Sequence, residues 1–191
     1  MDWIQLLMLV AIAVFYFAYF AKALLLKRRG ISTQRMGRGS KPRRTCIIEA
    51  LLSIATFGMA AVQLVSLFWL TPFMFPSFVR IGGAALSFLG TLVFITAMVQ
   101  MRDSWRAGVD ETQKTRLVTS GIYRISRNPA FVGFDLFYLG TLFALPNPLS
   151  IGFALFAILM MHLQILEEEK YLPGVFGKDY EDYRRKTRRY L

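Results

Sequence analysis

Long apolar runs constrain this chain more than any other feature of its sequence. Five of them lie between charged stretches, at 4–26, 46–70, 78–101, 129–145 and 149–166. The first three exceed the roughly 20 residues that a helix needs to cross a bilayer, and the last two are slightly shorter. Hydrophobic residues make up 55% of the chain, which is more than soluble domains contain. The sequence therefore predicts an all-α integral membrane protein with about five transmembrane helices.

Basic residues gather in three blocks that share one side of the membrane if the chain crosses it five times. Lys and Arg number eight in 27–44, six in 102–127 and seven after Leu166, whereas the connections TPFMFP and PNP contain none. The positive-inside rule then predicts cytosolic blocks, a cytosolic C-terminus and an N-terminus outside. The same rule accounts for the net charge of +11 without a nucleic-acid partner.

Two regions are expected along the chain. Residues 1–101 would form a three-helix transmembrane region with a basic cytosolic loop at 27–44. Residues 102–191 would contain a cytosolic loop, a helical hairpin at 129–166 turned by PNP, and a C-terminal helix. The tail has aromatic and Thr residues at spacings of 4, 3, 4 and 3 from Phe176 to Tyr190, which predicts a cytosolic amphipathic helix. This helix would rest on the membrane surface or also cover a site that opens to the cytosol.

The triplet Arg127–Asn128–Pro129 stands where the fourth apolar run begins. Asn is a favoured N-cap residue and Pro is favoured at the first helical position, so the triplet can simply start a helix. The free N–H groups of a helix start also carry a partial positive charge, to which Arg127 would add a full one. A carboxylate or phosphate would be well held there, and both interpretations stay open.

Three consecutive glutamates at 167–169 follow the fifth apolar run. Carboxylates at a helix C-terminus oppose the macrodipole. They predict either a helix that continues into the tail with arginines beside it, or a cation site. The hairpin would bring them level with Asn128, so that a zwitterionic ligand with an apolar body, such as S-adenosylmethionine, would match both groups. Methyl transfer from this donor needs no metal, and the lone His162 offers no metal-ligand cluster.

Two further polar residues lie inside the apolar runs. Asp135 is about two helical turns into the fourth run, where a carboxylate is costly and often functional. It could stabilise a cationic acceptor or take its proton, or it could only form a buried hydrogen bond. His162 could be a base or a structural donor. With Glu168 and Glu169, these two are the candidate catalytic residues.

The segments TRLVTSGIYRISRNPAFVG, EEEKYL and FGKDYEDYRRKTRRYL, in this order around the hairpin, resemble the isoprenylcysteine carboxyl methyltransferase and phospholipid methyltransferase superfamily. The segment WRAGV at 105–109 resembles its bacterial branch, which implies a bacterial inner membrane. The resemblance covers roughly 105–191 and implies a cytosolic S-adenosylmethionine pocket between the last two helices and their flanking segments. Beside Arg127, the residues that it implies for the cofactor are Thr115, Arg116, Leu117, Val118, Tyr123, Asn128, Pro129, Ala130, Phe131, Glu168, Tyr180 and Tyr183.

Three positions depart from that family pattern. Asn128 stands where the family usually has His, and Phe131 where it has Tyr. Gln164 stands where carboxyl-methylating members have an Arg, which would pair with a substrate carboxylate. Gln164 and Trp105 are the candidate substrate-binding residues, and a neutral Gln favours an amine, thiol or hydroxyl acceptor.

The sequence thus predicts a membrane methyltransferase that uses S-adenosylmethionine, binds no metal and acts on a lipophilic or amphipathic acceptor. The acceptor, a phospholipid amine, an isoprenoid-like molecule or a thiol, would enter from the surrounding lipid. Two alternatives stay open. One is a transporter or lipid-binding protein without catalysis, and the other is a membrane reductase with a nicotinamide cofactor.

Overall fold

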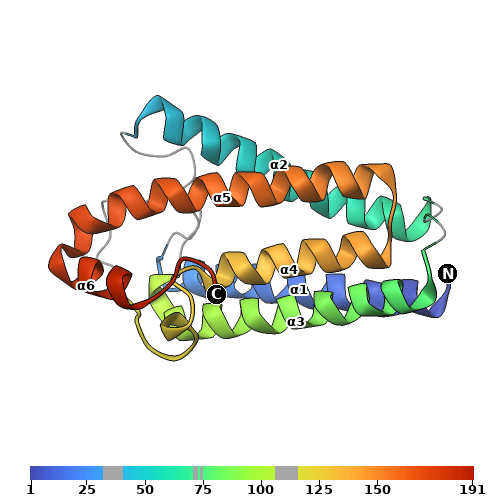
Figure 1. The fold of residues 1–191 in the computed structure, drawn as a ribbon, viewed down its shortest axis with the longest axis horizontal. Coiled ribbons are helices and arrows are strands. Elements are labelled where there is room, and N and C mark those ends of the chain that lie inside the picture. Colours follow the sequence, from blue (N-terminus) through green and yellow to red (C-terminus); the bar gives the residue numbers. More distant parts are fainter. Residues whose placement is uncertain (32–40, 71–72, 74, 106–115) are drawn as a thin grey trace.

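The computed structural model describes residues 1–31, 41–70, 73, 75–105 and 116–191. Six α-helices run through them (Figure 1): α1 (Trp3–Arg28), α2 (Arg43–Phe68), α3 (Ser77–Met101), α4 (Pro129–Ala144), α5 (Pro148–Phe176) and α6 (Lys178–Lys186). The 3₁₀ turns η1 (Arg102–Ser104) and η2 (Gly121–Arg124) complete the described elements, which include no β-strand. Four helices are long and apolar enough to cross a membrane, and α4 is a shorter apolar helix. The prediction of an all-α membrane protein is confirmed.

Helices α1 and α5 both begin at the end of the molecule that carries the N-terminus, and local sequence signals account for both starts. Asp2 caps α1, because its side chain accepts from the Gln5 amide at 2.8 Å while the Gln5 side chain accepts from the Asp2 amide at 2.7 Å. Asn147 caps α5 with its side-chain oxygen, which accepts from the Ser150 amide at 3.0 Å, and Pro148 takes the first helical position. The PNP turn therefore forms the predicted antiparallel hairpin of α4 and α5.

The helices form two layers (Figure 1). Helix α4 packs along α3, with α1 beside both, and α5 packs along α2. The two hairpin helices thus belong to different layers. Near the PNP end, Gln63 of α2 joins the layers, because it accepts from the Tyr16 hydroxyl at 2.8 Å and donates to the Thr141 hydroxyl at 3.1 Å. Toward the basic end the layers separate (Figure 1).

Glycine makes the contact between α3 and α4 unusually close. A Cβ added to Gly90 would lie 2.5 Å from the Phe137 nitrogen, and one added to Gly133 would lie 2.7 Å from the Phe94 nitrogen. Gly83 and Gly140 make equivalent contacts one heptad away on each helix. Small residues at this spacing let two helix backbones touch, which is a common way to pack helices in a membrane.

Two boundaries in the last third of the chain differ from the predicted ranges. Helix α5 extends beyond the hairpin bound at 166, because its hydrogen-bonded backbone continues through the three glutamates to Phe176, which is the alternative of a helix that continues into the tail. The tail does not form one helix to Tyr190, since the backbone turns at Gly177, where φ is +54°, and α6 ends at Lys186. The continuous amphipathic face from Phe176 to Tyr190 is therefore not formed. Half of the basic loop predicted at 27–44, residues 32–40, lies outside the described residues.

Candidate functional site

A cavity of about 590 Å³ opens between the two layers at the basic end of the molecule. Most residues that the sequence predicted for a site border it, although they come from four separate segments. These are Trp105, Arg116, Leu117, Val118, Tyr123, Arg127, Asn128, Pro129, Ala130, Phe131, Gln164, Glu168, Tyr180 and Tyr183. Thr115 lies outside the described residues. The start of α4 and the acidic segment of α5 therefore share one cavity, as the hairpin prediction required.

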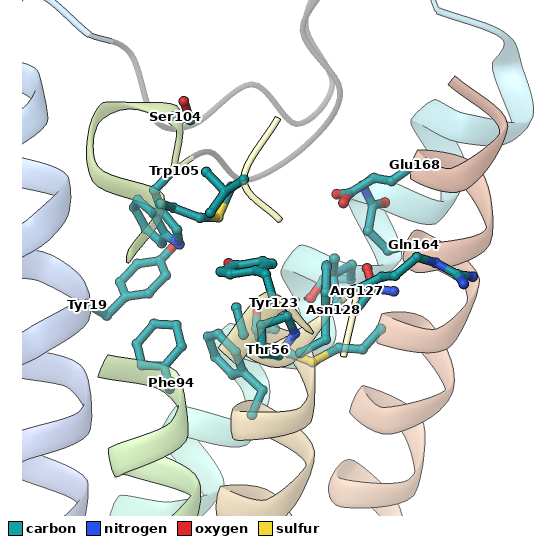
Figure 2. Close-up of a pocket in the computed structure, with 18 of the residues that line it drawn as sticks. Tyr19, Thr56, Phe94, Ser104, Trp105, Tyr123, Arg127, Asn128, Gln164 and Glu168 are labelled. Carbon is teal, nitrogen blue, oxygen red and sulfur yellow. Dashed lines mark hydrogen bonds between the residues drawn. The ribbon is translucent and has the colours of Figure 1, made fainter. Parts of the chain in front are cut away.

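Helix α5 gives the cavity a polar wall. Figure 2 shows Gln164 and Glu168 projecting from one turn of α5. The Gln164 side-chain amide donates to the Glu168 carboxylate at 3.0 Å, because residues four apart meet on a helix face. Gln164 is 1% exposed, and its carbonyl oxygen has no hydrogen-bond partner in the described structure. This wall therefore offers an acidic group and an unused acceptor to a ligand.

Aromatic rings form the facing wall. Figure 2 shows Tyr19, Phe94 and Trp105 together, across the cavity from Glu168. The ring centroid of Tyr19 lies 5.5 Å from that of Trp105 in an edge-on contact and 6.3 Å from that of Phe94. Aromatic faces attract cations. A positively charged group between the two walls would meet a carboxylate on one side and ring faces on the other.

Glu169 lies next to Glu168 but does not border the cavity. It forms two buried ion pairs instead, at 2.7 Å to Arg127 and at 2.8 Å to Arg189. Arg127 also donates to the carbonyl oxygen of Thr187 at 2.6 Å. We call the group Arg127, Glu169 and Arg189 the Glu169 clasp, because it fastens the C-terminal segment to the start of α4. The Arg127 charge predicted beside the helix start is therefore paired, and because one carboxylate serves two guanidinium groups the clasp keeps a net positive charge.

Asn128 takes the N-cap position of α4 without capping it. Its side chain forms no hydrogen bond to the first turn of the helix. The side-chain amide donates instead to the Arg189 carbonyl at 3.1 Å and more weakly to Glu169 at 3.4 Å. The predicted side-chain cap is therefore wrong, and Asn128 is bound to the C-terminal segment.

Tyrosines of α6 close the cavity at the basic end of the molecule. The Tyr183 hydroxyl donates to the Tyr123 carbonyl at 2.6 Å. Tyr180 is 1% exposed, and the Arg127 guanidinium lies beside its hydroxyl. Burial raises the pKa of Tyr183 to about 12 and raises that of Tyr123 as well. These phenols therefore stay protonated at neutral pH and can donate hydrogen bonds.

Two more of the predicted catalytic residues lie outside the cavity, as Glu169 does. The His162 imidazole is bonded to the Tyr190 hydroxyl. Asp135 is half-buried, and one of its carboxylate oxygens has no hydrogen-bond partner in the described part of the chain. Neither residue borders the cavity. Glu167 also points elsewhere, since it pairs with Lys170 at 2.6 Å and accepts from the Thr45 hydroxyl at 2.8 Å.

Sequence reasoning missed the part of the site that α1 and α2 supply. Tyr16, Tyr19 and Phe20 of α1 border the cavity, as do Thr56 and Phe57 of α2. The only available signal was the aromatic run FYFAYF at 15–20, which contains two polar hydroxyls inside an apolar span. Hydropathy places such a run in the membrane but does not tell which side faces a cavity.

The part of the cavity farthest from the basic end is apolar and opens at the outer surface of the molecule. Phe20, Phe57 and Leu64 border it and are 54%, 58% and 46% exposed. In a membrane, such exposed apolar side chains contact lipid chains. The cavity thus combines a polar mouth at the basic end with an apolar flank between α1 and α2.

These features define a helical membrane protein with an amphipathic cavity. A family model described as phospholipid methyltransferase matches residues 78–179, just over half of the chain. The chain belongs to this family, and the predicted resemblance is confirmed. The matched segment holds α3, α4 and α5 but not the α1 and α2 side of the cavity.

Relatives from several eukaryotes have one name, protein-S-isoprenylcysteine O-methyltransferase. The protein of Dictyostelium discoideum is 32% identical over 136 residues, covering 68% of this chain and 57% of that protein. That of Schizosaccharomyces pombe is 39% identical over 109 residues (54% and 46%). That of Tribolium castaneum is 25% identical over 183 residues (92% and 60%). The chain spans about half the length of these relatives, and its place in a bacterial branch stays a prediction.

Proposed function

We propose that this protein is an integral membrane methyltransferase that transfers a methyl group from S-adenosylmethionine to a lipophilic acceptor. One observation carries the proposal: a single cavity joins the start of α4, the Gln164–Glu168 wall and the α6 tyrosines to a flank that lies open to lipid. Membership in the phospholipid methyltransferase family and the names of the relatives support the reaction class.

The residues at the mouth fit this donor. It would supply a methyl group on a positively charged sulfur. The Glu168 carboxylate and the aromatic wall of Tyr19 and Trp105 favour positive charge between them. The unpartnered Gln164 carbonyl would accept from its polar groups. Buried polar atoms normally have hydrogen-bond partners, so this oxygen suggests a polar ligand.

The acceptor would reach the site through the apolar flank between α1 and α2. Its nucleophilic atom forms a bond to the methyl carbon as the sulfur–methyl bond breaks, and the sulfur keeps the electron pair. A proton on that nucleophile then leaves to solvent or to Glu168. The residues mainly hold the acceptor and the donor in line and exclude water, and this alignment lowers the barrier to methyl transfer. Gln164 carries no charge. Among the described residues, the cationic side chains that border the cavity are Arg116 and Arg127. We therefore favour an amine, thiol or hydroxyl group over a carboxylate as the methyl acceptor.

Calorimetry on detergent-solubilised protein tests the donor. We expect S-adenosylmethionine to bind and NADPH not to bind. Incubation of membranes with a donor carrying a labelled methyl group, followed by mass spectrometry of the lipid extract, would then identify the acceptor. Binding of NADPH alone would favour a reductase, and binding of neither ligand would favour a transporter or lipid-binding protein.

The orientation is part of the proposal. The mouth of the cavity lies at the end where Lys and Arg gather, so it would face the cytosol, with the N-terminus outside. Cys46 is the single cysteine. A Cys46→Ser background carrying a new cysteine at Ser77 or at Ser120 would show the orientation by labelling with an impermeant thiol reagent. Labelling of Ser120→Cys in sealed whole cells would contradict it.

A further inference from the structure

A buried ion pair lies behind the polar wall of the cavity. The Lys41 ammonium donates to both carboxylate oxygens of Glu49, at 2.7 and 2.9 Å. The two side chains are 9% and 0% exposed, and neither residue borders the cavity. Removing two charges from water costs free energy, which their mutual attraction only partly offsets. Stability alone is therefore a weak reason for such a pair.

Helix packing brings this pair close to Glu168. Helices α2 and α5 lie side by side and run in opposite directions (Figure 1). Their register is fixed by the Thr45 hydroxyl, which donates to the Glu167 carboxylate at 2.8 Å. Glu49 is four residues further along α2, and Gln164 is three residues back along α5. Each step is about one helical turn, so Glu49 lies opposite the turn of α5 that holds Gln164 and Glu168.

Both charges of the pair act on the Glu168 carboxylate. Burial opposes the negative charge of this carboxylate, Glu49 repels it and Lys41 attracts it; such interactions are screened only weakly inside a protein. The other polar or charged groups near Glu168 are Gln164 and Glu169 of α5, Tyr123 of η2, and Arg116 and Arg127 on the cavity lining. Glu169 binds Arg127, and Arg116 is exposed. We therefore expect Lys41 to be the cation with the larger effect on Glu168.

We propose that Lys41 is a positioning residue for the methyl donor: held in place by Glu49, its charge keeps the Glu168 carboxylate ionised, so that this carboxylate can bind the positive part of the donor. The inference rests on the proposed function and deepens it. It adds the start of α2 to the donor site, although α2 lies outside the segment 78–179 that the family model matches. Lys41 acts through Glu168, since it does not itself border the cavity.

The charge of Glu168 can be followed without any donor. Infrared difference spectra between each protein and the same protein carrying Glu168→Gln isolate the carboxyl band of this residue. Titration of that band in the detergent-solubilised full-length protein gives the pH midpoint at which Glu168 loses its proton. Calorimetry with S-adenosylmethionine over the same pH range then measures how the donor affinity follows this midpoint.

The two members of the pair should shift the midpoint in opposite directions. Lys41→Met removes an attracting charge and should raise the midpoint by about one unit, the lower end of the range for a nearby charge. Below the midpoint, the donor affinity should then fall about tenfold. Glu49→Gln removes a repelling charge and should lower the midpoint. Arg43→Met is the matched control, because Arg43 is an exposed cation two residues along the chain; its midpoint should equal that of the native protein.

The double variant Lys41→Met, Glu49→Gln covers the case in which Lys41→Met does not fold. It removes the Lys41 charge from a protein in which the Glu49 carboxylate is also gone. Its midpoint should lie above that of Glu49→Gln, because the attracting charge is the only difference between the two proteins.

Three results would overturn the inference: an unchanged midpoint in Lys41→Met, a shift of the same sign in Lys41→Met and Glu49→Gln, or equal midpoints in Glu49→Gln and the double variant. A donor affinity that falls by the same factor at every pH, without a shift of the midpoint, would show that the pair only supports packing. Absence of donor binding in the native protein would refute the proposed function, and the infrared midpoints would still decide whether Lys41 sets the charge of Glu168.

Discussion

The two faces of α4 are built in opposite ways. Its glycine face, with Gly133 and Gly140, presses backbone against backbone on α3 and leaves no space for a methyl group. Its other face, with Phe131 and Tyr138, borders a cavity of about 590 Å³. One helix thus has a rigid side that fixes its position and an open side that can receive a ligand. Changes on the first side should affect folding, and changes on the second should affect binding.

The largest effect is expected on the glycine face. Gly90→Leu should lower the free energy of unfolding by about 3 kcal/mol or more, because the new side chain meets backbone atoms that cannot move aside. Thermal unfolding in detergent measures the loss. The control is Gly82→Leu on the same helix, where an added Cβ meets nothing within 4 Å. Equal melting temperatures of the two variants would contradict the comparison.

The Glu169 clasp should show the next largest effect. Glu169→Gln leaves Arg127 and Arg189 without their buried partner, and loss of one member of a buried ion pair costs about 3 kcal/mol. The C-terminal segment should then detach, which limited proteolysis would detect alongside chemical unfolding. Glu181→Gln, at an exposed position of α6, is the matched control. A native digestion pattern in Glu169→Gln would refute the clasp.

On the open side, Glu168→Gln should leave stability nearly unchanged, because the new side chain fills the same space. We expect the affinity for S-adenosylmethionine to fall about tenfold to a hundredfold, the range for one hydrogen bond to a charged group. Calorimetry measures this difference. Glu167→Gln, one residue earlier and outside the cavity, should bind the donor normally. Similar losses in both variants would show a general charge effect.

The smallest effect is expected at Tyr183. Tyr183→Phe removes the hydrogen bond to the Tyr123 carbonyl and should cost about 1 kcal/mol. Burial raises the pKa of Tyr183 from 10.0 to about 12 in the folded protein. The folded state thus keeps a proton that the unfolded state loses, so this contribution is complete below pH 10 and disappears as the pH rises to 12. Unfolding measured at pH 9 and pH 11 should show a smaller decrease for Tyr183→Phe than for the native protein.

The elements were predictable wherever hydropathy and turn chemistry agreed. The apolar runs located α1 to α4 and the start of α5, and Asn147 with Pro148 located the turn. The end of α5 was not predictable by the same criterion, because Glu167 to Lys170 end the apolar run without ending the helix. Glu and Lys are good helix formers, and backbone hydrogen bonds do not require an apolar side chain.

The site was predictable in part. The level of Glu168 relative to Asn128 followed from the hairpin. The ion pair between Arg127 and Glu169 did not follow from the sequence, because the two residues are far apart along the chain. Only the folded tail brings Arg189 to Glu169. The contribution of Tyr19 and Thr56 was also hidden, since helices that face lipid and helices that face a cavity have similar composition. A free charge and a paired charge look alike in a sequence.

The length of α5 has a consequence for where the chemistry can happen. Its 29 residues span about 44 Å, whereas the hydrocarbon of a bilayer is about 30 Å thick. If the PNP end sits at the far boundary of the hydrocarbon, the last nine residues or so project among the lipid headgroups. Glu168 begins this projecting part. The reacting groups would then meet in the headgroup layer, a thin zone that a dissolved nucleoside and a membrane lipid can both reach without leaving their own phase.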